Sequence, residues 1–292
     1  MADHNGTSMN GKVVVITGGN AGIGKEAAAD LSRQGATVVI TSRNPQRGQS
    51  AVRDIRDRAN GTDVDVLDLD LASLASVRRF AAEILDRYER LDVLLNNAGL
   101  IQSRRTETED GFETTLGVNH LGHFALTNRL LDRLRANPGG ARVVNVSSHA
   151  HKGARRGLDF DDLQSTRHYS GSGVYSKSKL ANILFTRELS RRLADDPVTV
   201  NALHPGFVRT EFGRDGDAQG VYGFGVRLAA PFAISLEKGA RTSVYLASSP
   251  EVDGVTGAYF YKCHPAPTSS AAADDEAARR LWDVSAELVG MS

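Results

Sequence analysis

The stretch KVVVITGGNAGIG, Lys12 to Gly24, decides the fold of this 292-residue chain. It opens with a β-branched apolar run, Lys12–Thr17, of the kind that forms a strand buried on both faces. A glycine-rich turn follows and leads into a helical pattern that begins at Gly22 and ends at Gly35. A buried strand that passes through glycines into a helix is the start of a strand–helix–strand unit. The stretch therefore predicts a parallel sheet covered by helices.

The alternation of strand and helix patterns continues to the end of the chain. Six further apolar runs predict strands at residues 36–41, 63–70, 91–97, 141–148, 198–206 and 257–261. Helical patterns lie between or after them at residues 45–59, 73–88, 118–136, 173–193, 235–248 and 274–289. About seven strands in this order predict a Rossmann-type α/β fold, a doubly wound parallel sheet with helices on both faces. We expect a single domain over residues 11–292, preceded by a polar tail at 1–10.

Composition narrows the class of protein. The 35 basic and 35 acidic side chains cancel, so no global field favours nucleic acid or a membrane surface as a partner. No apolar run reaches the ~18 residues of a membrane span, and the N-terminus lacks a secretion signal. The single cysteine, Cys263, excludes an internal disulfide and a cysteine-based metal cluster, and the histidines show no HExxH spacing. We expect a soluble cytoplasmic protein without a metal site.

The glycine turn predicts a phosphate-binding site. Gly18, Gly22 and Gly24 follow the spacing G-x-x-x-G-x-G. Where side chains are missing, a pyrophosphate can approach the backbone, and the N-terminus of the following helix offers free N–H groups and positive potential. An ordinary strand–helix turn is the alternative, but the position between a buried strand and a helix favours dinucleotide binding.

The end of the second strand indicates which dinucleotide binds. A carboxylate there would bind the ribose 2′-hydroxyl of NAD and repel a 2′-phosphate. This strand ends instead in Ser42 and Arg43. A guanidinium can hold a phosphate by two parallel hydrogen bonds. The sequence therefore predicts NADP(H) rather than NAD(H), with a solvated surface role for Arg43 as the alternative.

Tyr175 and Lys179 form the pair that predicts acid–base chemistry. They are four residues apart in a helical pattern, so they share one helix face. An adjacent ammonium favours the phenolate and lowers the tyrosine pKa toward the range in which a general acid is useful. Such pairs are common on solvated helices. Ser148, which ends an upstream strand, adds a donor for an oxygen that develops charge, and this favours the catalytic interpretation.

These patterns together resemble the classical subgroup of the short-chain dehydrogenases/reductases, from Lys12 to about Tyr261. The motifs that carry the resemblance occur in the family's order: TGGNAGIG, NNAG at 96–99, VNHLGHFALT around Asn119, VVNVSS ending at Ser148, YSKSK at 175–179 and HPGFVRT at 204–210. VNHLGHF, VVNVSSHAH, KLANILFTRELSRRL and ARRLWDVSAEL are similar to the retinol dehydrogenase-like branch.

The resemblance implies a catalytic set of four residues. Tyr175 would transfer the proton, Lys179 would hold the nicotinamide ribose hydroxyls, and Ser148 would hydrogen-bond the substrate oxygen. Asn119 would help to hold a water that relays protons. The family's usual pairing through the Asn119 and Tyr175 helices implies a homodimer or homotetramer, which the additional C-terminal helix could change.

The resemblance also implies a cofactor-binding set, in which Asp70 would contact the adenine amino group. The whole set lies at strand ends and in the turns after them: Gly18, Asn20, Gly22, Ile23, Gly24, Ser42, Arg43, Asp70, Leu71, Asn97, Ala98, Gly99, Tyr175, Lys179, Pro205, Gly206, Val208 and Thr210.

Residues 211–234 are rich in glycine and in large apolar side chains. This composition predicts a lid that closes over the site and a hydrophobic ketone, aldehyde or alcohol as substrate, with a helix pair packed on the core as the alternative. The functions left open are an NADP(H)-dependent oxidoreductase, an epimerase or dehydratase-like relative with the same cofactor site, and a non-catalytic dinucleotide-binding sensor. The intact catalytic set favours the oxidoreductase.

Overall fold

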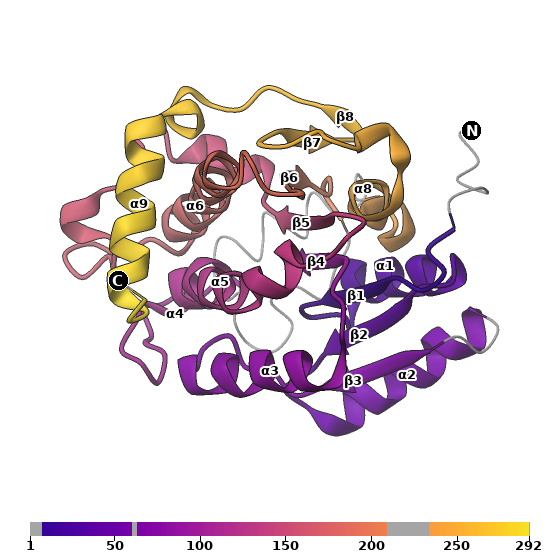
Figure 1. The fold of residues 1–292 in the computed structure, drawn as a ribbon. Helices are drawn as coiled ribbons and strands as arrows, with labels where there is room; N and C mark the ends of the chain where they lie inside the picture. Colours follow the sequence, from indigo (N-terminus) through magenta and orange to yellow (C-terminus); the bar gives the residue numbers. More distant parts are fainter. Residues whose placement is uncertain (1–7, 60–62, 209–233, 292) are drawn as a thin grey trace.

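The computed structural model describes residues 8–59, 63–208 and 234–291, in which eight strands form one sheet (Figure 1). The strands are β1 (Val13–Ile16), β2 (Thr37–Thr41), β3 (Val64–Leu67), β4 (Val93–Asn96), β5 (Ala141–Val146), β6 (Val198–His204), β7 (Tyr259–Tyr261) and β8 (His264–Pro265). Their order is β3-β2-β1-β4-β5-β6-β7-β8. The first seven are parallel, which confirms the predicted doubly wound α/β fold, and β8 is antiparallel to β7.

Helices cover both faces of this sheet (Figure 1). One face is covered by α1 (Gly22–Arg33), α2 (Pro45–Arg58) and α8 (Leu236–Ser248), and the other by α3 (Leu74–Arg87), α5 (Gly122–Arg135) and α6 (Gly171–Arg192), with α9 (Asp275–Leu288) packed on α6. Successive strand residues alternate between the two cores. Val14 and Ile16 belong to the α1 side, and Val13 and Val15 to the α6 side. The predicted apolar runs are therefore explained by burial on both faces.

Short helical turns complete the part of the chain that the structure describes. They are α4 (Thr114–Leu116), a π-helical segment at Gly117–Leu121, and 3₁₀ turns at His149–Gly153, Phe160–Asp162, Pro250–Val252 and Ser270–Ala273. The helix predicted at 118–136 is thus divided, because the segment that contains Asn119 has the wider π-helical turn. Such segments are frequent at functional sites.

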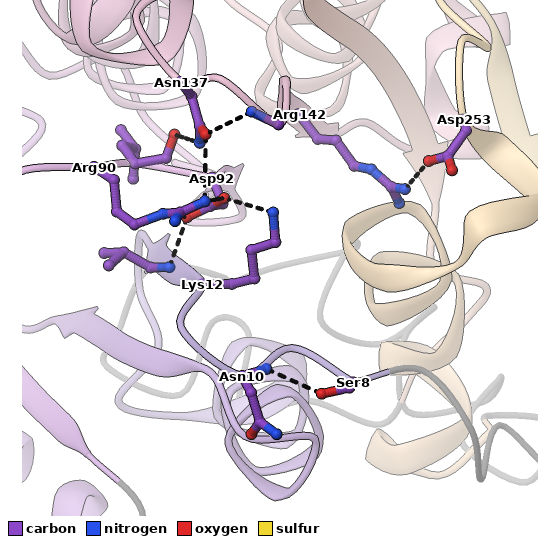
Figure 2. A network of polar contacts seen from close by, with 11 residues as sticks. Ser8, Asn10, Lys12, Arg90, Asp92, Asn137, Arg142 and Asp253 are labelled. Atoms are coloured by element: carbon purple, nitrogen blue, oxygen red, sulfur yellow. Dashed lines mark hydrogen bonds and ion pairs between the residues drawn. The ribbon is translucent and has the colours of Figure 1, made fainter.

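A buried carboxylate, Asp92, ties β1 to β4 at the amino edge of the sheet (Figure 2). It accepts the Val13 N–H at 2.9 Å and two hydrogen bonds from Arg90 at 2.8 and 2.6 Å, and it lies 3.1 Å from Lys12 Nζ. Burial alone would raise the pKa of this carboxyl, but these partners hold it below its ordinary value. The network lies at the edge opposite the ends of the strands that carry the predicted site.

The N-terminal boundary and the helix lengths bear on two further expectations. Met9, within the predicted polar tail, is buried, and its N–H donates to Gln34 O at 2.8 Å. Met9 is therefore part of the packed domain. Among the described residues, no helix combines the length and the apolarity that crossing a bilayer requires.

Candidate active site

The glycine turn after β1 has the geometry of a phosphate cradle. Gly18 has a φ of +65°, which glycine adopts without strain. A Cβ atom on Gly24 would lie 2.5 Å from Asn97 Nδ2 and 2.6 Å from Gly18 O, so the start of α1 can approach its neighbours this closely only as glycine. Ala21, the N-cap of α1, makes no side-chain hydrogen bond to the first turn of the helix. The first N–H groups of α1 are therefore not capped by this side chain, and the turn fits a pyrophosphate.

The ends of β2 and β3 place Arg43 near Asp70. The Arg43 side chain is 66% exposed, and its Nη1 lies 4.0 Å from Asp70 Oδ1. The Ser42 hydroxyl donates to Asn44 O at 2.8 Å and therefore belongs to the turn before α2. Asp70 Oδ1 accepts the Ala72 N–H at 2.9 Å. The weakly held guanidinium of Arg43 is therefore the group at the ends of β2 and β3 that is most accessible to a ligand.

Thr17, which sequence reasoning did not single out, joins the glycine turn to the turn after β4. Its Oγ1 accepts the N–H groups of Asn97 at 2.9 Å and Ala98 at 3.0 Å. Asn97 Nδ2 in turn donates to Thr17 O at 2.8 Å. The predicted residues of both turns are thus brought together at the switch point of the sheet, where the strand order reverses between β1 and β4.

Asn119 connects the segment after β4 with α6. Its Oδ1 accepts the Leu100 N–H at 2.8 Å, and its Nδ2 donates to Leu100 O at 2.9 Å and to Ser178 Oγ at 3.0 Å. Ser178 donates onward to Tyr175 O at 2.8 Å. The Asn119 amide is therefore engaged in holding the backbone on both sides of the site. Ser178 is a second residue that the motifs did not identify.

Lys179 is buried, with 3% of its surface exposed. Its Nζ donates to Val146 O at 3.0 Å and lies 5.7 Å from the centre of the Tyr175 ring. The Ser147 hydroxyl donates to Lys179 O at 2.7 Å, so Lys179 makes two of the hydrogen bonds that join α6 to the end of β5. Burial lowers the pKa of Lys179 to about 8. The side chain is therefore charged at neutral pH and loses its proton as the pH rises through about 8.

Ser148 is the residue after Ser147, and it directly precedes the 3₁₀ turn at 149–153. Its hydroxyl accepts the Ala150 N–H at 3.1 Å, and its carbonyl accepts a hydrogen bond from His151 Nδ1 at 2.7 Å. The side chain is half-buried. Ser148 thus lies next to the Ser147–Lys179 contact.

Gly99 forms the wall of the site beside Asn119 and Lys179. A methyl group on Gly99 would lie 3.2 Å from Asn119 Oδ1 and 3.3 Å from Lys179 Nζ. Pro205 and Gly206 follow β6, and Val208 pairs with Ile234 in an isolated bridge.

Three other members of the cofactor set are less exposed to a ligand. Ile23 packs toward Gly239 of α8, Leu71 is buried against Gly122 of α5, and Asn20 is half-buried in the glycine turn. Thr210 and residues 211–233 of the predicted lid lie outside the described residues. In the described parts of the chain, no group of three or more His, Cys, Asp or Glu side chains could hold a metal ion.

The doubly wound sheet and the glycine turn at its switch point define a dinucleotide-binding type of α/β protein, and Lys179, with Tyr175 on the same helix, lies beside the neighbouring turn at Gly99. The family model described as enoyl-(acyl carrier protein) reductase matches residues 18–262. Human retinol dehydrogenase 13 is 46% identical over 285 residues, which is 96% of this chain and 85% of that protein. The chain therefore belongs to the short-chain dehydrogenase/reductase family.

Solved structures agree with this assignment. An uncharacterised protein from Mycobacterium paratuberculosis has a TM-score of 0.77 and 38% identity, covering 97% of this chain and 95% of its own. A Beutenbergia cavernae protein, assigned as an NAD(P)-dependent gluconate 5-dehydrogenase and solved with NADP at low occupancy, has a TM-score of 0.69 and 26% identity. It covers 87% of this chain and 96% of its own.

We predict that Gly99→Ala weakens nicotinamide dinucleotide binding about tenfold, because the added methyl group displaces Lys179 Nζ and Asn119. Isothermal titration calorimetry measures the affinity, and thermal melting checks that the fold is intact. Gly139→Ala is the matched control, because its methyl group would lie 3.3 Å from another ammonium, Lys12 Nζ, at the amino edge. Wild-type affinity in Gly99→Ala, or an equal loss in Gly139→Ala, would contradict this assignment.

Proposed function

We propose that this protein is an NADP(H)-dependent oxidoreductase that interconverts a hydrophobic ketone or aldehyde and the corresponding alcohol, with Tyr175 as the general acid/base. The observation that carries the proposal is the buried ammonium of Lys179, 5.7 Å from the Tyr175 ring. Among the described residues, Nζ donates one hydrogen bond, to Val146 O. An ammonium has three donors, so Nζ can also donate to hydroxyl groups of a ligand.

The residues present fit a nicotinamide dinucleotide phosphate. The uncapped start of α1 and the cradle at Gly18 and Gly24 would hold the pyrophosphate. Arg43, exposed at the end of β2 where no carboxylate stands, would hold the 2′-phosphate. The Lys179 ammonium would hold the nicotinamide ribose hydroxyls. When bound, the cofactor supplies or accepts the hydride.

The side chains of this protein transfer one proton and stabilise the charge that develops on the substrate oxygen. In the reduction direction, the substrate oxygen becomes basic, and the Tyr175 hydroxyl donates its proton to that oxygen. The Lys179 ammonium favours the phenolate that remains. The Ser148 hydroxyl can rotate to donate to the same oxygen, because its bond to the Ala150 N–H uses only a lone pair. Oxidation of an alcohol uses the same groups in reverse.

An aromatic stack beside Ser148 supports an apolar substrate. The rings of His149 and His204 lie 5.7 Å apart, and His204 stacks on Tyr261 at 5.0 Å and 20°. These residues follow or end β5, β6 and β7, so they line one stretch of the carboxyl edge. Tyr261 is 37% exposed and Phe207 nearby is 45% exposed. Exposed aromatic surface beside convergent polar groups suits a hydrophobic carbonyl or alcohol.

We predict that Tyr175→Phe retains the fold and NADPH binding but lowers turnover by roughly three orders of magnitude or more, because the proton donor is lost. NADPH consumption with a panel of apolar ketones and aldehydes measures turnover, and calorimetry measures binding. Tyr169→Phe removes another partly buried tyrosine hydroxyl, which bonds Gln102 O, and serves as the control. Near-normal turnover in Tyr175→Phe, or NADPH binding without turnover of any carbonyl by the wild type, would overturn the proposal.

We predict that kcat/KM for carbonyl reduction falls as the pH rises through about 8. The pKa of Lys179 is lowered to about 8 by burial, so its charge is present below that pH and is lost above it. Without the charge, Tyr175 is a weaker acid. Lys179→Arg keeps its charge throughout this range and moves the falling limb to higher pH. A wild-type profile that stays flat from pH 6.5 to about 9.5 would exclude this role for Lys179.

We predict that the wild type prefers NADPH to NADH, and that Arg43→Ala weakens NADPH binding by about 1.5–3 kcal/mol, the value of a charged hydrogen bond, while NADH binding changes little. The affinities of both dinucleotides for both proteins decide this. Arg47→Ala, in the first turn of α2, serves as a charge-matched control. If the wild type binds NADH as tightly as NADPH, the assignment of the 2′-phosphate to Arg43 is wrong.

A further inference from the structure

A buried histidine, His123, joins the cofactor-side turns to the helix segment that contains Asn119. It lies in the first turn of α5 and is 3% exposed. Its Nε2 is 2.9 Å from Thr17 Oγ1, and its Nδ1 is 3.2 Å from Asn119 O. No local sequence pattern links this residue to its partner Thr17, which is 106 positions away.

The hydrogen bonds around His123 admit one arrangement of protons. The carbonyl of Asn119 can only accept, so Nδ1 carries the proton and Nε2 presents a lone pair. The Thr17 hydroxyl therefore donates to Nε2. Its two lone pairs accept the N–H groups of Asn97 and Ala98. Each donor and acceptor in this series of hydrogen bonds, which runs from the Ala98 N–H through Thr17 and His123 to Asn119 O, then has a partner.

A charged imidazole does not fit this arrangement. Its Nε2–H would point at Thr17 Oγ1, whose two lone pairs are already used. The Thr17 proton would then have only Leu95 O, at 3.5 Å, as an acceptor. Burial is the main cause that lowers the pKa of His123 to about 3, and the charge of Lys179 acts in the same direction.

We propose that His123 is a positioning residue, a neutral imidazole protonated at Nδ1 that fixes the main chain of Asn119 relative to the turn at 97–99. Through this contact it sets the position of Asn119 Oδ1 and thereby of Leu100, which lies one residue after Gly99. Gly99 faces both Asn119 and Lys179. A displacement of the His123 ring would therefore move both sides of the crevice. The kinetic consequence rests on the function proposed above, whereas the state of the ring does not.

The first test determines the protonation of His123 in the wild type. Two-dimensional ¹⁵N NMR of histidine-labelled protein, assigned by comparison with His123→Asn, distinguishes Nδ1–H, Nε2–H and the doubly protonated ring. The expected result is the Nδ1–H form with no titration between pH 5.5 and about 9. An Nε2–H form, or a midpoint near the ordinary ~6.5, overturns the proposal. This measurement requires no substrate and is therefore independent of the proposed oxidoreductase activity.

The second test separates positioning from stability. We expect His123→Leu to lower kcat roughly 10- to 100-fold while the NADPH dissociation constant changes less. His123→Asn keeps a donor near the position of Nδ1, so it should recover part of kcat. The matched control is Ser285→Ala, which removes the 2.8 Å contact between Ser285 Oγ and His120, a buried histidine of the adjoining segment. It should lower the melting temperature and leave kcat within about twofold.

The outcomes of this second test are decisive in both directions. Wild-type kcat in a folded His123→Leu, or an equal kcat loss in Ser285→Ala, overturns the proposal. If His123→Leu does not fold, Thr17→Ser and Thr17→Val replace it, because serine keeps the hydroxyl and valine removes it. Positioning requires that Thr17→Ser retains kcat and Thr17→Val loses it, and equal kcat values in the two variants contradict it. A wild type that reduces no carbonyl at all counts against the proposed function, and the NMR result then decides the state of His123.

Discussion

The structure of the site depends on one constraint, the burial of a lysine ammonium between β5 and α6. Removing such a charge from water is unfavourable, and the lowering of the Lys179 pKa from 10.5 to about 8 corresponds to roughly 3 kcal/mol. The cost is limited by the bond from Nζ to Val146 O. Burial also strengthens the effect of the charge, because a poorly solvated ammonium acts strongly on any phenol or ligand hydroxyl that reaches it. Burial therefore makes Lys179 effective toward Tyr175.

A buried amide network maintains this arrangement below the site. Asn96 of β4 donates to Asn145 Oδ1 of β5 at 2.8 Å, and Asn145 donates to Thr186 Oγ1 of α6 at 2.9 Å. Asn182, one turn before Thr186, donates to the same Val146 carbonyl that accepts from Lys179. Polar groups inside a core fix one register of neighbouring elements, because any slip leaves them unpaired. The helix that carries Tyr175 is thus aligned by more than apolar packing with β5, the strand that leads to Ser148.

The sequence predicts this architecture well where the signal is local or periodic. Strands buried on both faces are continuous apolar runs, so β1 and β5 were identifiable, and the turn that holds Gly18 and the helix that holds Tyr175 carry recognisable motifs. The π-helical segment at Asn119 differs from an α-helix by one residue per turn and leaves no periodic signal. The hairpin before β8 uses positive φ at Lys262 and Cys263, at 51° and 64°, where neither glycine nor asparagine marks the turn.

The features that the sequence does not predict depend on contacts between segments that are distant in the sequence. These contacts also determine the charges around the site. Two buried histidines contact segments that are distant in the sequence: His123 contacts Thr17, which follows β1, and His120 contacts Ser285 of α9. Burial lowers the pKa values of His120 and His123 to about 4 and about 3, so neither ring is charged at neutral pH. Two imidazolium ions here would repel the Lys179 ammonium and favour its deprotonation. Because these neighbours are neutral, Lys179 can remain protonated at pH 7 although it is buried.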